Sequence, residues 1–577
     1  MNKFFLKVSL ISIAVTLIAA CVSTTDKHAE KSSAKAKNHK LTKNLVATAH
    51  PLATQAALEI LENGGNAFDA AVAASAVLSV VEPSGSGMGG GGFWLLHRES
   101  DGKQVMIDGR EMAPAAAHRD MYLDENKQVI KNASLNGALA AGIPGQPAAL
   151  AHISDNYGNL SFAQNLQAAI KYADQGFAAN NHIVKHLKFR SKIFNAEAKR
   201  LFLDNGQVPT VGTVIKQPEL ANTLKLIAKQ GRKGFYQGDV AQKMVSYVQN
   251  NGGIWTLDDL KKYQVIERPP VVFNYKGNRI VTAALPSSGG IVMGQILQTI
   301  ELEQKERGEQ GAPSMHLFVE AMRRAYRDRS LYLGDSDFIN VNQQTLLNPT
   351  YLQQFVNEIG DTATASEDLS IERNLGVDTT HFSIIDKDGN RVAATLSINY
   401  PFGSGHVADG TGIILNNEMD DFVSKAGEPN VYGLVGGKAN QIEPGKRPLS
   451  SMSPTFVETK HGAIAIGTPG GSRIISMVAL AISNIVDKGM NLQHAIDAPR
   501  YHHQYLPDAV QLEKDTVYAQ ETDLTAKGHQ FKRLNRKYGN MHAVAWEKSD
   551  NNVRYSAASD SRGEGSAKVV QVTSKVK

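Results

Sequence analysis

The sequence predicts an α/β (α+β) fold in which helices flank stacked β-sheets. Segments with helical periodicity dominate the first two thirds of the chain, and short strand-like segments dominate the part that follows Asp378. The composition, 42% apolar and 20% charged over 577 residues, is that of an ordinary globular protein with a large core. Helices packed against sheets in layers are the simplest arrangement for this pattern.

Two helices are expected at the start of the folded body, which begins near Leu45. Residues 53–62 form the first helix, and the pair Gly64-Gly65 ends it. Residues 67–81 are apolar on nearly every side and predict a second, largely buried helix. Further helices are expected around 145–175, 215–250 and 314–331.

A β-hairpin is expected directly after Asp378. Residues 381–385 and 391–399 are rich in β-branched and aromatic side chains, and the segment DKDGN between them carries an Asp-Gly turn signal. Further strands are expected near 412–416 and 462–467, and a helix near 473–487.

The register of this hairpin decides which side chains meet. If the turn centres on Asp388, Thr379 lies opposite Ser397, and Asn399 points to the same face; a shift of one residue would break this pairing. A threonine hydroxyl becomes an effective nucleophile when the threonine is an N-terminus and its own α-amine takes the proton. That chemistry requires cleavage of the bond before Thr379. On the hairpin alone, a buried pair of strand hydroxyls is the simpler interpretation.

Other segments carry groups suited to an amino-acid substrate. In GTPGGSRII, Gly470 and Gly471 lie between a strand and a helix, where successive backbone N–H groups suit a developing oxyanion. Carboxylates hold an ammonium group well, and an arginine with hydroxyls holds a carboxylate. The candidates are Glu418 and Asp421 for the first role, and Arg110, Ser450 and Ser451 for the second. Taken singly, each segment is more simply a turn or a solvated surface feature.

The net charge of +5 is concentrated at the N-terminus. Residues 1–44 hold eight Lys against two acidic residues, so the rest of the chain carries a net charge of −1. A nucleic-acid-binding protein needs its basic residues on the folded surface that grips phosphate. We therefore expect no nucleic-acid partner.

Residues 1–20 predict a lipoprotein signal peptide. Lys3 and Lys7 precede an apolar stretch too short to span a bilayer, and its end, IAAC, resembles a bacterial lipobox that finishes at Cys21, the only cysteine. The resemblance implies a lipid on Cys21. We expect an exported protein that is lipid-anchored at the periplasmic face of the bacterial envelope, in the outer membrane, with residues 21–44 as the lipidated cysteine and a flexible tether. An ordinary signal peptide is the alternative.

Long motifs across residues 45–565 resemble the γ-glutamyltranspeptidase (glutathione hydrolase) family, in the same chain order. They include ATQAALEILENGGNAFDAAVA (53–73), IDGREMAPAAA (107–117), TTHFSIIDKDGN (379–390), KRPLSSMSPT (446–455) and APRYHHQ (498–504). The resemblance implies an N-terminal-nucleophile hydrolase fold, which is a four-layer αββα sandwich. It also implies a precursor that cuts itself between Asp378 and Thr379 into a large subunit (45–378) and a small subunit (379–577), which stay together as one catalytic unit without a cofactor or metal.

The resemblance also implies a role for each matched residue. Thr379 is the autoprocessing residue and the nucleophile, and its α-amine is the base. Ser397 stands where the family usually has a second Thr that hydrogen-bonds the nucleophile, and the missing methyl leaves its χ1 less restricted. Gly470 and Gly471 match the oxyanion hole. The substrate-binding matches are Asn399, Glu418 and Asp421 for the γ-glutamyl α-ammonium, Arg110, Ser450 and Ser451 for its α-carboxylate, and Tyr432 as a lid over the pocket.

The implied reaction begins when Thr379 attacks the γ-carbonyl of glutathione or another γ-glutamyl compound. Water, an amino acid or a peptide then takes the γ-glutamyl group from the enzyme. Two alternatives stay open. One is a related acylase of the same fold, acting on cephalosporin or glutaryl side chains or on poly-γ-glutamate. The other is a lipid-anchored protein that binds γ-glutamyl peptides without turnover.

Motifs for other chemistries are missing from the sequence. Gly89–Gly92 lacks the Lys of a phosphate-binding loop, and no GxSxG elbow is present. His502 and His503 are neighbours that would point to opposite faces of a strand, and no HExxH motif or Cys cluster accompanies them. We therefore expect no metal site.

Overall fold

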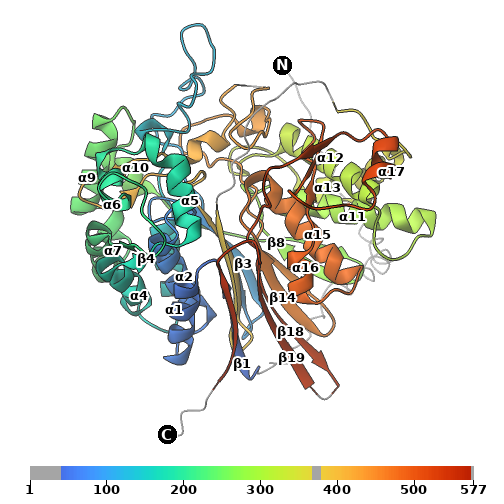
Figure 1. The fold of residues 1–577 in the computed structure, drawn as a ribbon, viewed down its shortest axis with the longest axis horizontal. Helices are drawn as coiled ribbons and strands as arrows, with labels where there is room; N and C mark the ends of the chain where they lie inside the picture. Colours follow the sequence, from blue (N-terminus) through green and yellow to red (C-terminus); the bar gives the residue numbers. More distant parts are fainter. Residues whose placement is uncertain (1–40, 367–378, 426, 551, 573–577) are drawn as a thin grey trace, which may run out of the picture. The chain divides into compact units, whose positions relative to one another are not determined.

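Two antiparallel β-sheets lie face to face at the centre of the computed structural model, which describes residues 41–366, 379–425, 427–550 and 552–572 (Figure 1). The seven-stranded sheet has the order β20 (Ser566–Gln571), β1 (Lys43–Thr48), β9 (Thr380–Ile385), β10 (Arg391–Ser397), β2 (Gly91–Arg98), β3 (Lys103–Gly109) and β6 (Ile266–Arg268). The six-stranded sheet has the order β19 (Asn552–Ser559), β18 (His542–Ser549), β14 (Gly462–Gly467), β13 (Thr455–Glu458), β8 (Asn278–Thr282) and β7 (Val271–Tyr275). The predicted signal peptide, Cys21 and Asp378 lie outside the described residues.

Helices cover the outer face of each sheet (Figure 1). The seven-stranded sheet packs against α1 (Pro51–Glu62), α2 (Ala67–Val81) and α3 (Gln146–Tyr157), with α4 (Phe162–Gln175) and α7 (Pro218–Gln230) outside them. The six-stranded sheet packs against α11 (Gly289–Arg307), α15 (Ile474–Val486) and α16 (Leu492–Asp497), with α12 (Met315–Tyr332) and α14 (Pro349–Glu358) beyond. This is the four-layer αββα sandwich that the sequence resemblance implies.

Shorter elements lie around the four layers. The helices are α5 (Asn181–Arg190), α6 (Ala196–Phe202), α8 (Lys233–Tyr236), α9 (Gly238–Asn250), α10 (Leu257–Lys262), α13 (Gln343–Leu346) and α17 (Glu521–Ala526). The strands are β4 (Phe177–Ala178), β5 (Val214–Ile215), β11 (Val407–Ala408), β12 (Ile413–Ile414), β15 (Tyr501–His502), β16 (Val510–Leu512) and β17 (Phe531–Arg533).

Alternation along β9 divides the core into two clusters. Phe382 and Ile384 belong to the cluster that includes the buried side chains of α1 and α2, whereas Ile385 belongs to the cluster between the two sheets. Successive strand side chains point to opposite faces. At the start of β9, Thr380 therefore faces the helix layer and Thr379 faces the second sheet.

Most predicted elements are confirmed to within two residues. The buried helix 67–81 and the strand 462–467 match α2 and β14 at both ends, and the helix 314–331 is shifted by one residue. The expected strand 391–399 ends at Ser397, and the expected strand 412–416 is reduced to Ile413–Ile414.

Two long predicted helices are wrong because each is broken. Residues 145–175 form α3 and α4, since Gly158 caps the first helix and Ser161 starts the second with a capping box. Residues 215–250 form α7, α8 and α9, and Gly231 adopts a left-handed φ of 60° at the first break. The folded body also begins at Lys43 in β1, two residues before the expected start and inside the expected tether.

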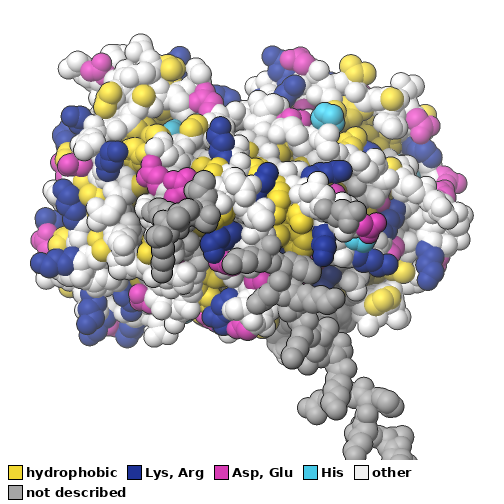
Figure 2. Space-filling view, turned by 90° about the horizontal axis from the view of Figure 1, so that it is seen from below, with side chains coloured by type: hydrophobic (Ala, Val, Ile, Leu, Met, Phe, Trp, Pro, Cys, Tyr) yellow, Lys and Arg dark blue, Asp and Glu magenta, His cyan; other side chains and the backbone are white. Residues whose placement is uncertain are grey.

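Basic and acidic side chains are interspersed on the face that Figure 2 shows. Neither sign of charge forms a continuous stripe on this face, which is typical of a solvated protein surface. Within the described ranges, no helix combines the length and apolar character needed to cross a bilayer.

Candidate active site

The β9–β10 hairpin has the predicted register. Leu396 pairs with Thr380, so continuing the ladder by one residue places Ser397 opposite Thr379. Thr379 and Ser397 are buried, with exposed fractions of 5% and 3%, and both line the same pocket. The Asp-Gly turn and the alternation of the two strands therefore bring two hydroxyls together from sequence positions 18 residues apart.

The second sheet approaches this pair through a glycine. The His381 ring lies so close to Gly467 that a Cβ atom at Gly467 would be 2.3 Å from it. His381 Nδ1 also lies 2.8 Å from Thr395 Oγ1 of β10, so the ring joins β9 and β10 and packs against β14 of the second sheet. Since Gly467 ends β14, the loop that follows β14 lies beside the start of β9.

This loop turns sharply before it enters α15. Gly470 has a φ of 147° and Gly471 a φ of 59°, and a short 3-10 helix, Gly471–Arg473, leads into α15. Gly471 lines the pocket, and a Cβ atom there would lie 2.4 Å from the Tyr432 ring. Gly470 is not among the described residues that line the pocket, and a Cβ atom there would meet Met477. Gly471 is thus at the pocket wall, and Gly470 precedes it in the loop.

Arg110 also lines the pocket, just past the end of β3. Its guanidinium is buried and pairs with Glu418, and it donates to Asp421 Oδ2 at 2.6 Å and to the Pro448 carbonyl at 3.2 Å. Glu418 and Asp421 belong to a short 3-10 helix, Glu418–Asp421. Glu111 is also fully buried and lies 3.6 Å from the guanidinium.

The cluster around Arg110 holds three carboxyl groups, those of Glu111, Glu418 and Asp421. Burial raises the pKa of Glu418 to about 7 and raises the pKa values of Asp421 and Glu111, although Arg110 opposes each shift. Glu418 Oε2 and Asn399 Oδ1 are buried acceptors that have no hydrogen-bond donor among the described residues. Unpaired buried acceptors are costly, and a cationic donor group entering the pocket would satisfy them.

The predicted serines lie beside an arginine that the sequence did not indicate. Arg329 of α12 is buried and donates to Ser451 Oγ at 3.3 Å and to Ser288 Oγ at 3.0 Å. Burial lowers its pKa to about 10, so it stays cationic at neutral pH. Ser450 Oγ accepts a hydrogen bond from the Met452 N–H at 3.1 Å. Helix α12 also carries Arg323, Arg324 and Arg327, and no sequence signal separates Arg329 from them.

The predicted lid residue closes the pocket. The Tyr432 hydroxyl donates to the Asn399 carbonyl at 2.5 Å, and its ring covers Gly471. Asn430 donates to Asp421 Oδ1 at 3.1 Å, which ties the same loop to the acidic wall. Only 4% of Tyr432 is exposed.

One pocket therefore gathers nearly all the predicted residues. Its lining includes Arg110, Thr379, Ser397, Asn399, Glu418, Asp421, Tyr432, Ser450, Ser451 and Gly471, together with Arg329, Leu434, Met452, Ser472 and Ile474, which were not predicted.

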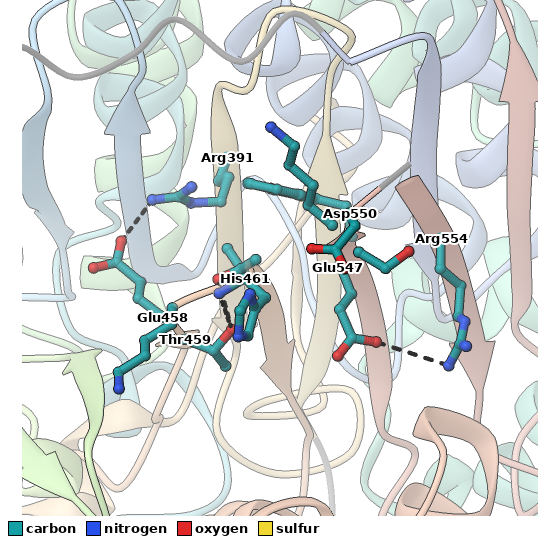
Figure 3. Close-up of a pocket in the computed structure, with 13 residues that line it drawn as sticks. Arg391, Glu458, Thr459, His461, Glu547, Asp550 and Arg554 are labelled. Atoms are coloured by element: carbon teal, nitrogen blue, oxygen red, sulfur yellow. Dashed lines mark hydrogen bonds and ion pairs between the residues drawn. The ribbon is translucent and has the colours of Figure 1, made fainter. Parts of the chain in front are cut away.

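A larger groove lies at the other end of the β9–β10 hairpin (Figure 3). Four of its charged groups pair with one another: Arg391 Nη2 lies 2.6 Å from Glu458 Oε1, and Arg554 lies 3.7 Å from Glu547. None of the predicted site residues is among the described residues that line it. We therefore place the candidate active site in the smaller pocket.

The histidine pair has structural partners. His502 Nδ1 lies 2.8 Å from Ser476 Oγ, and His503 Nε2 lies 3.1 Å from Asp508 Oδ1. Across the described residues, no group of three or more His, Cys, Asp or Glu side chains is arranged to hold a metal ion.

The molecule has four layers, and Thr379, at the start of a central strand of one sheet, faces the other sheet. These two features define an N-terminal-nucleophile hydrolase fold. The comparisons with known proteins then identify the family. Residues 53–570 match the family model described as gamma-glutamyltranspeptidase. The chain therefore belongs to the γ-glutamyltranspeptidase family of hydrolase and transferase enzymes.

Relatives and solved structures agree with this assignment. The chain is 44% identical over 478 residues to the glutathione hydrolase proenzyme of Pseudomonas sp. strain A14, covering 81% of this chain and 83% of that protein. It is 42% identical to the Escherichia coli K12 glutathione hydrolase proenzyme, covering 82% of each. Cephalosporin acylase from Bacillus halodurans is similar over 95% of this chain and 99% of its own, with a TM-score of 0.78 and 25% identity. Helicobacter pylori gamma-glutamyltranspeptidase is similar over 56% of this chain and 93% of its own, with a TM-score of 0.54 and 39% identity.

Proposed function

We propose that this protein is a γ-glutamyltransferase and glutathione hydrolase with Thr379 as its nucleophile. The observation that carries the proposal is the pairing, in one pocket, of Thr379 with a cradle for an α-amino acid. Glutathione and other γ-glutamyl compounds present such a head group next to the amide bond that is cut.

The cradle has complementary ends. Glu418, Asp421 and the unpaired Asn399 Oδ1 suit the α-ammonium group, and Arg110, Ser450 and Ser451 suit the α-carboxylate. Before substrate binds, Arg110 pairs with the two acids, so the zwitterion would exchange one set of ion pairs for another. Arg329 supports the carboxylate end through Ser451.

The chemistry starts at the nucleophile. The Thr379 α-amine takes the proton from Oγ1 as this oxygen attacks the γ-carbonyl carbon, and backbone N–H groups of the Gly470-Gly471 loop are the proposed donors to the developing oxyanion. The C–N bond then breaks, and the leaving amine takes the proton. Water, or the amine of an amino acid or peptide, next attacks the γ-glutamyl ester and releases Thr379. No step needs a cofactor or metal.

A free Thr379 amine requires a cut precursor. We propose that the chain cleaves itself between Asp378 and Thr379, which yields a large subunit ending at Asp378 and a small subunit of residues 379–577. The relatives reported above, which are named proenzymes, support this step.

The competing activity is that of an acylase, which the likeness to the cephalosporin acylase supports. A glutaryl group has the same chain length as a γ-glutamyl group but lacks the α-ammonium. The unpaired acceptors Glu418 Oε2 and Asn399 Oδ1 favour the γ-glutamyl substrate, since a glutaryl group would leave them unsatisfied.

Rates with γ-glutamyl and glutaryl anilides test the proposal. We expect faster turnover of the γ-glutamyl compound. Glu418→Gln should raise its KM about tenfold or more, because a charged hydrogen bond is lost, and should change the glutaryl KM little. Faster turnover of the glutaryl compound by the wild-type protein would overturn the substrate assignment.

We also propose that Cys21 carries a lipid that anchors the protein in the bacterial envelope, at the periplasmic face of the outer membrane. Cys21→Ala should move the protein from the membrane fraction to the soluble fraction and leave anilide turnover unchanged. Unchanged membrane association of the variant would contradict the anchor.

A further inference from the structure

A buried carboxyl group lies on the other side of the nucleophile strand. Glu82 directly follows α2 and caps it, and its own N–H donates to the Leu78 carbonyl. Glu82 is 6% exposed, and its side chain accepts a hydrogen bond from the Thr380 hydroxyl. Thr380 is the residue after the proposed nucleophile. The acid therefore contacts the nucleophile strand from the helix layer, opposite the pocket.

The catalytic steps above do not use this acid, and burial is costly for it. Burial raises the pKa of Glu82 to about 7, and the hydrogen bond from Thr380 opposes this shift. His182 Nε2 of α5 lies 3.8 Å from Glu82 Oε1, but burial lowers the pKa of His182 to about 4, so this ring gives little charge compensation at neutral pH. An apolar residue at this helix end would avoid the cost.

The position of Thr380 in the sheet indicates what the hydrogen bond to Glu82 does. Thr380 is the first residue of β9, and its pairing with Leu396 is the last rung of the ladder toward the nucleophile. Once the chain is cut, Thr379 would be a terminal residue, and chain ends fray unless they are tied down. A displacement of about 1 Å at a reacting group can cost about a hundredfold in rate.

We propose that Glu82 is a positioning residue, whose hydrogen bond to Thr380 holds the main chain of Thr379 in place for attack. The inference rests on the proposed function, because it assigns Glu82 to the same nucleophile. Thr380 transmits the restraint, since its side chain points to the helix layer while the side chain of Thr379 points to the pocket. The acid touches neither the substrate nor the reacting atoms.

Two variants remove the hydrogen bond from opposite sides. Glu82→Ala and Thr380→Val should each lower kcat for γ-glutamyl anilide about tenfold or more, with KM within about twofold of wild type. Thr380→Ser keeps the hydroxyl and should keep most of kcat. The double variant should be no slower than the slower single variant, because both remove one interaction.

Asp69→Asn is the matched control. Asp69 lies at the other end of α2, is also buried, and accepts hydrogen bonds from the Asn159 N–H at 2.8 Å and the Asn165 amide at 2.9 Å. This variant should lower the melting temperature and leave kcat nearly unchanged. A variant that folds with the melting temperature of the control but stays uncut also supports the proposal, since the same threonine performs the cut.

The proposal is overturned if Thr380→Val keeps wild-type kcat, or if Asp69→Asn loses as much kcat as Glu82→Ala at the same loss of stability. If Glu82→Ala does not fold, the comparison of Thr380→Val with Thr380→Ser decides the question alone. If the wild-type protein turns over no γ-glutamyl compound, the proposed function fails, which is a separate result.

Discussion

Ser397 stands beside the proposed nucleophile, where the sequence resemblance implies a threonine. Its Oγ accepts the Asn399 N–H at 2.7 Å, and the hairpin places it opposite Thr379. Without a γ-methyl group its χ1 is less restricted than that of a threonine, so the backbone hydrogen bond takes over part of the positioning.

Ser397→Ala should lower kcat about tenfold, because it removes the hydroxyl beside the proposed nucleophile and leaves the Asn399 N–H without its acceptor. Ser397→Thr should keep wild-type kcat or raise it. Steady-state turnover of γ-glutamyl anilide gives both values. An alanine variant with wild-type kcat would show that this hydroxyl plays no part.

The sequence predicts which site residues are neighbours where a short turn of the chain fixes their pairing. Thr379 and Ser397 meet because a short turn sets their register, which the sequence shows directly. Arg329 reaches the pocket only because α12 packs beside the 450–451 segment, and no local pattern contains that contact. The contact that a Cβ atom at Gly470 would make with Met477 likewise has no local sequence signal.

At the scale of elements, buried helices and strands with clear ends were predicted well, and long amphipathic segments were not. α2 is buried along its whole length, so its apolar run has sharp limits at Asn66 and Glu82. Residues 145–175 are broken at Gly158, although both pieces bury apolar side chains in the same core cluster. Periodicity alone could not place that break.

Glu82, at the end of α2, also predicts how the stability of the protein depends on pH. The pKa of Glu82 is about 7 in the folded protein against an ordinary 4.5, so the folded state binds the proton more tightly. Proton binding by Glu82 therefore contributes about 3 kcal/mol to the free energy of unfolding. This contribution is fully present below about pH 4.5 and is lost as pH rises through about 7.

Glu82→Gln replaces the titratable carboxyl group with an amide that does not titrate. The difference in melting temperature between pH 5 and pH 8 should therefore be smaller for this variant than for the wild type. The comparison isolates Glu82 from Glu111 and Glu418, whose raised pKa values act in the same direction in both proteins. Equal pH dependence in the two proteins would contradict the account of this acid.

At the scale of the whole molecule, the site exists because two sheets face each other. The hairpin supplies the strand that carries the proposed nucleophile, β14 supplies the glycine loop, and the loops after β3 and β12 supply the charged wall. The sequence alone predicted stacked sheets flanked by helices. Local sequence patterns could not predict which strands of the two sheets face each other, because contacts such as that of His381 with Gly467 join segments 86 residues apart.

The central claim is that Thr379 becomes an N-terminus and then acts as the nucleophile. Mass analysis of purified wild-type protein should find two chains, one of which begins at Thr379, together with γ-glutamyl anilide turnover. Thr379→Ala should give one uncut, folded and inactive chain. An uncut wild-type chain that turns over the substrate, or a cut and active alanine variant, would contradict the account.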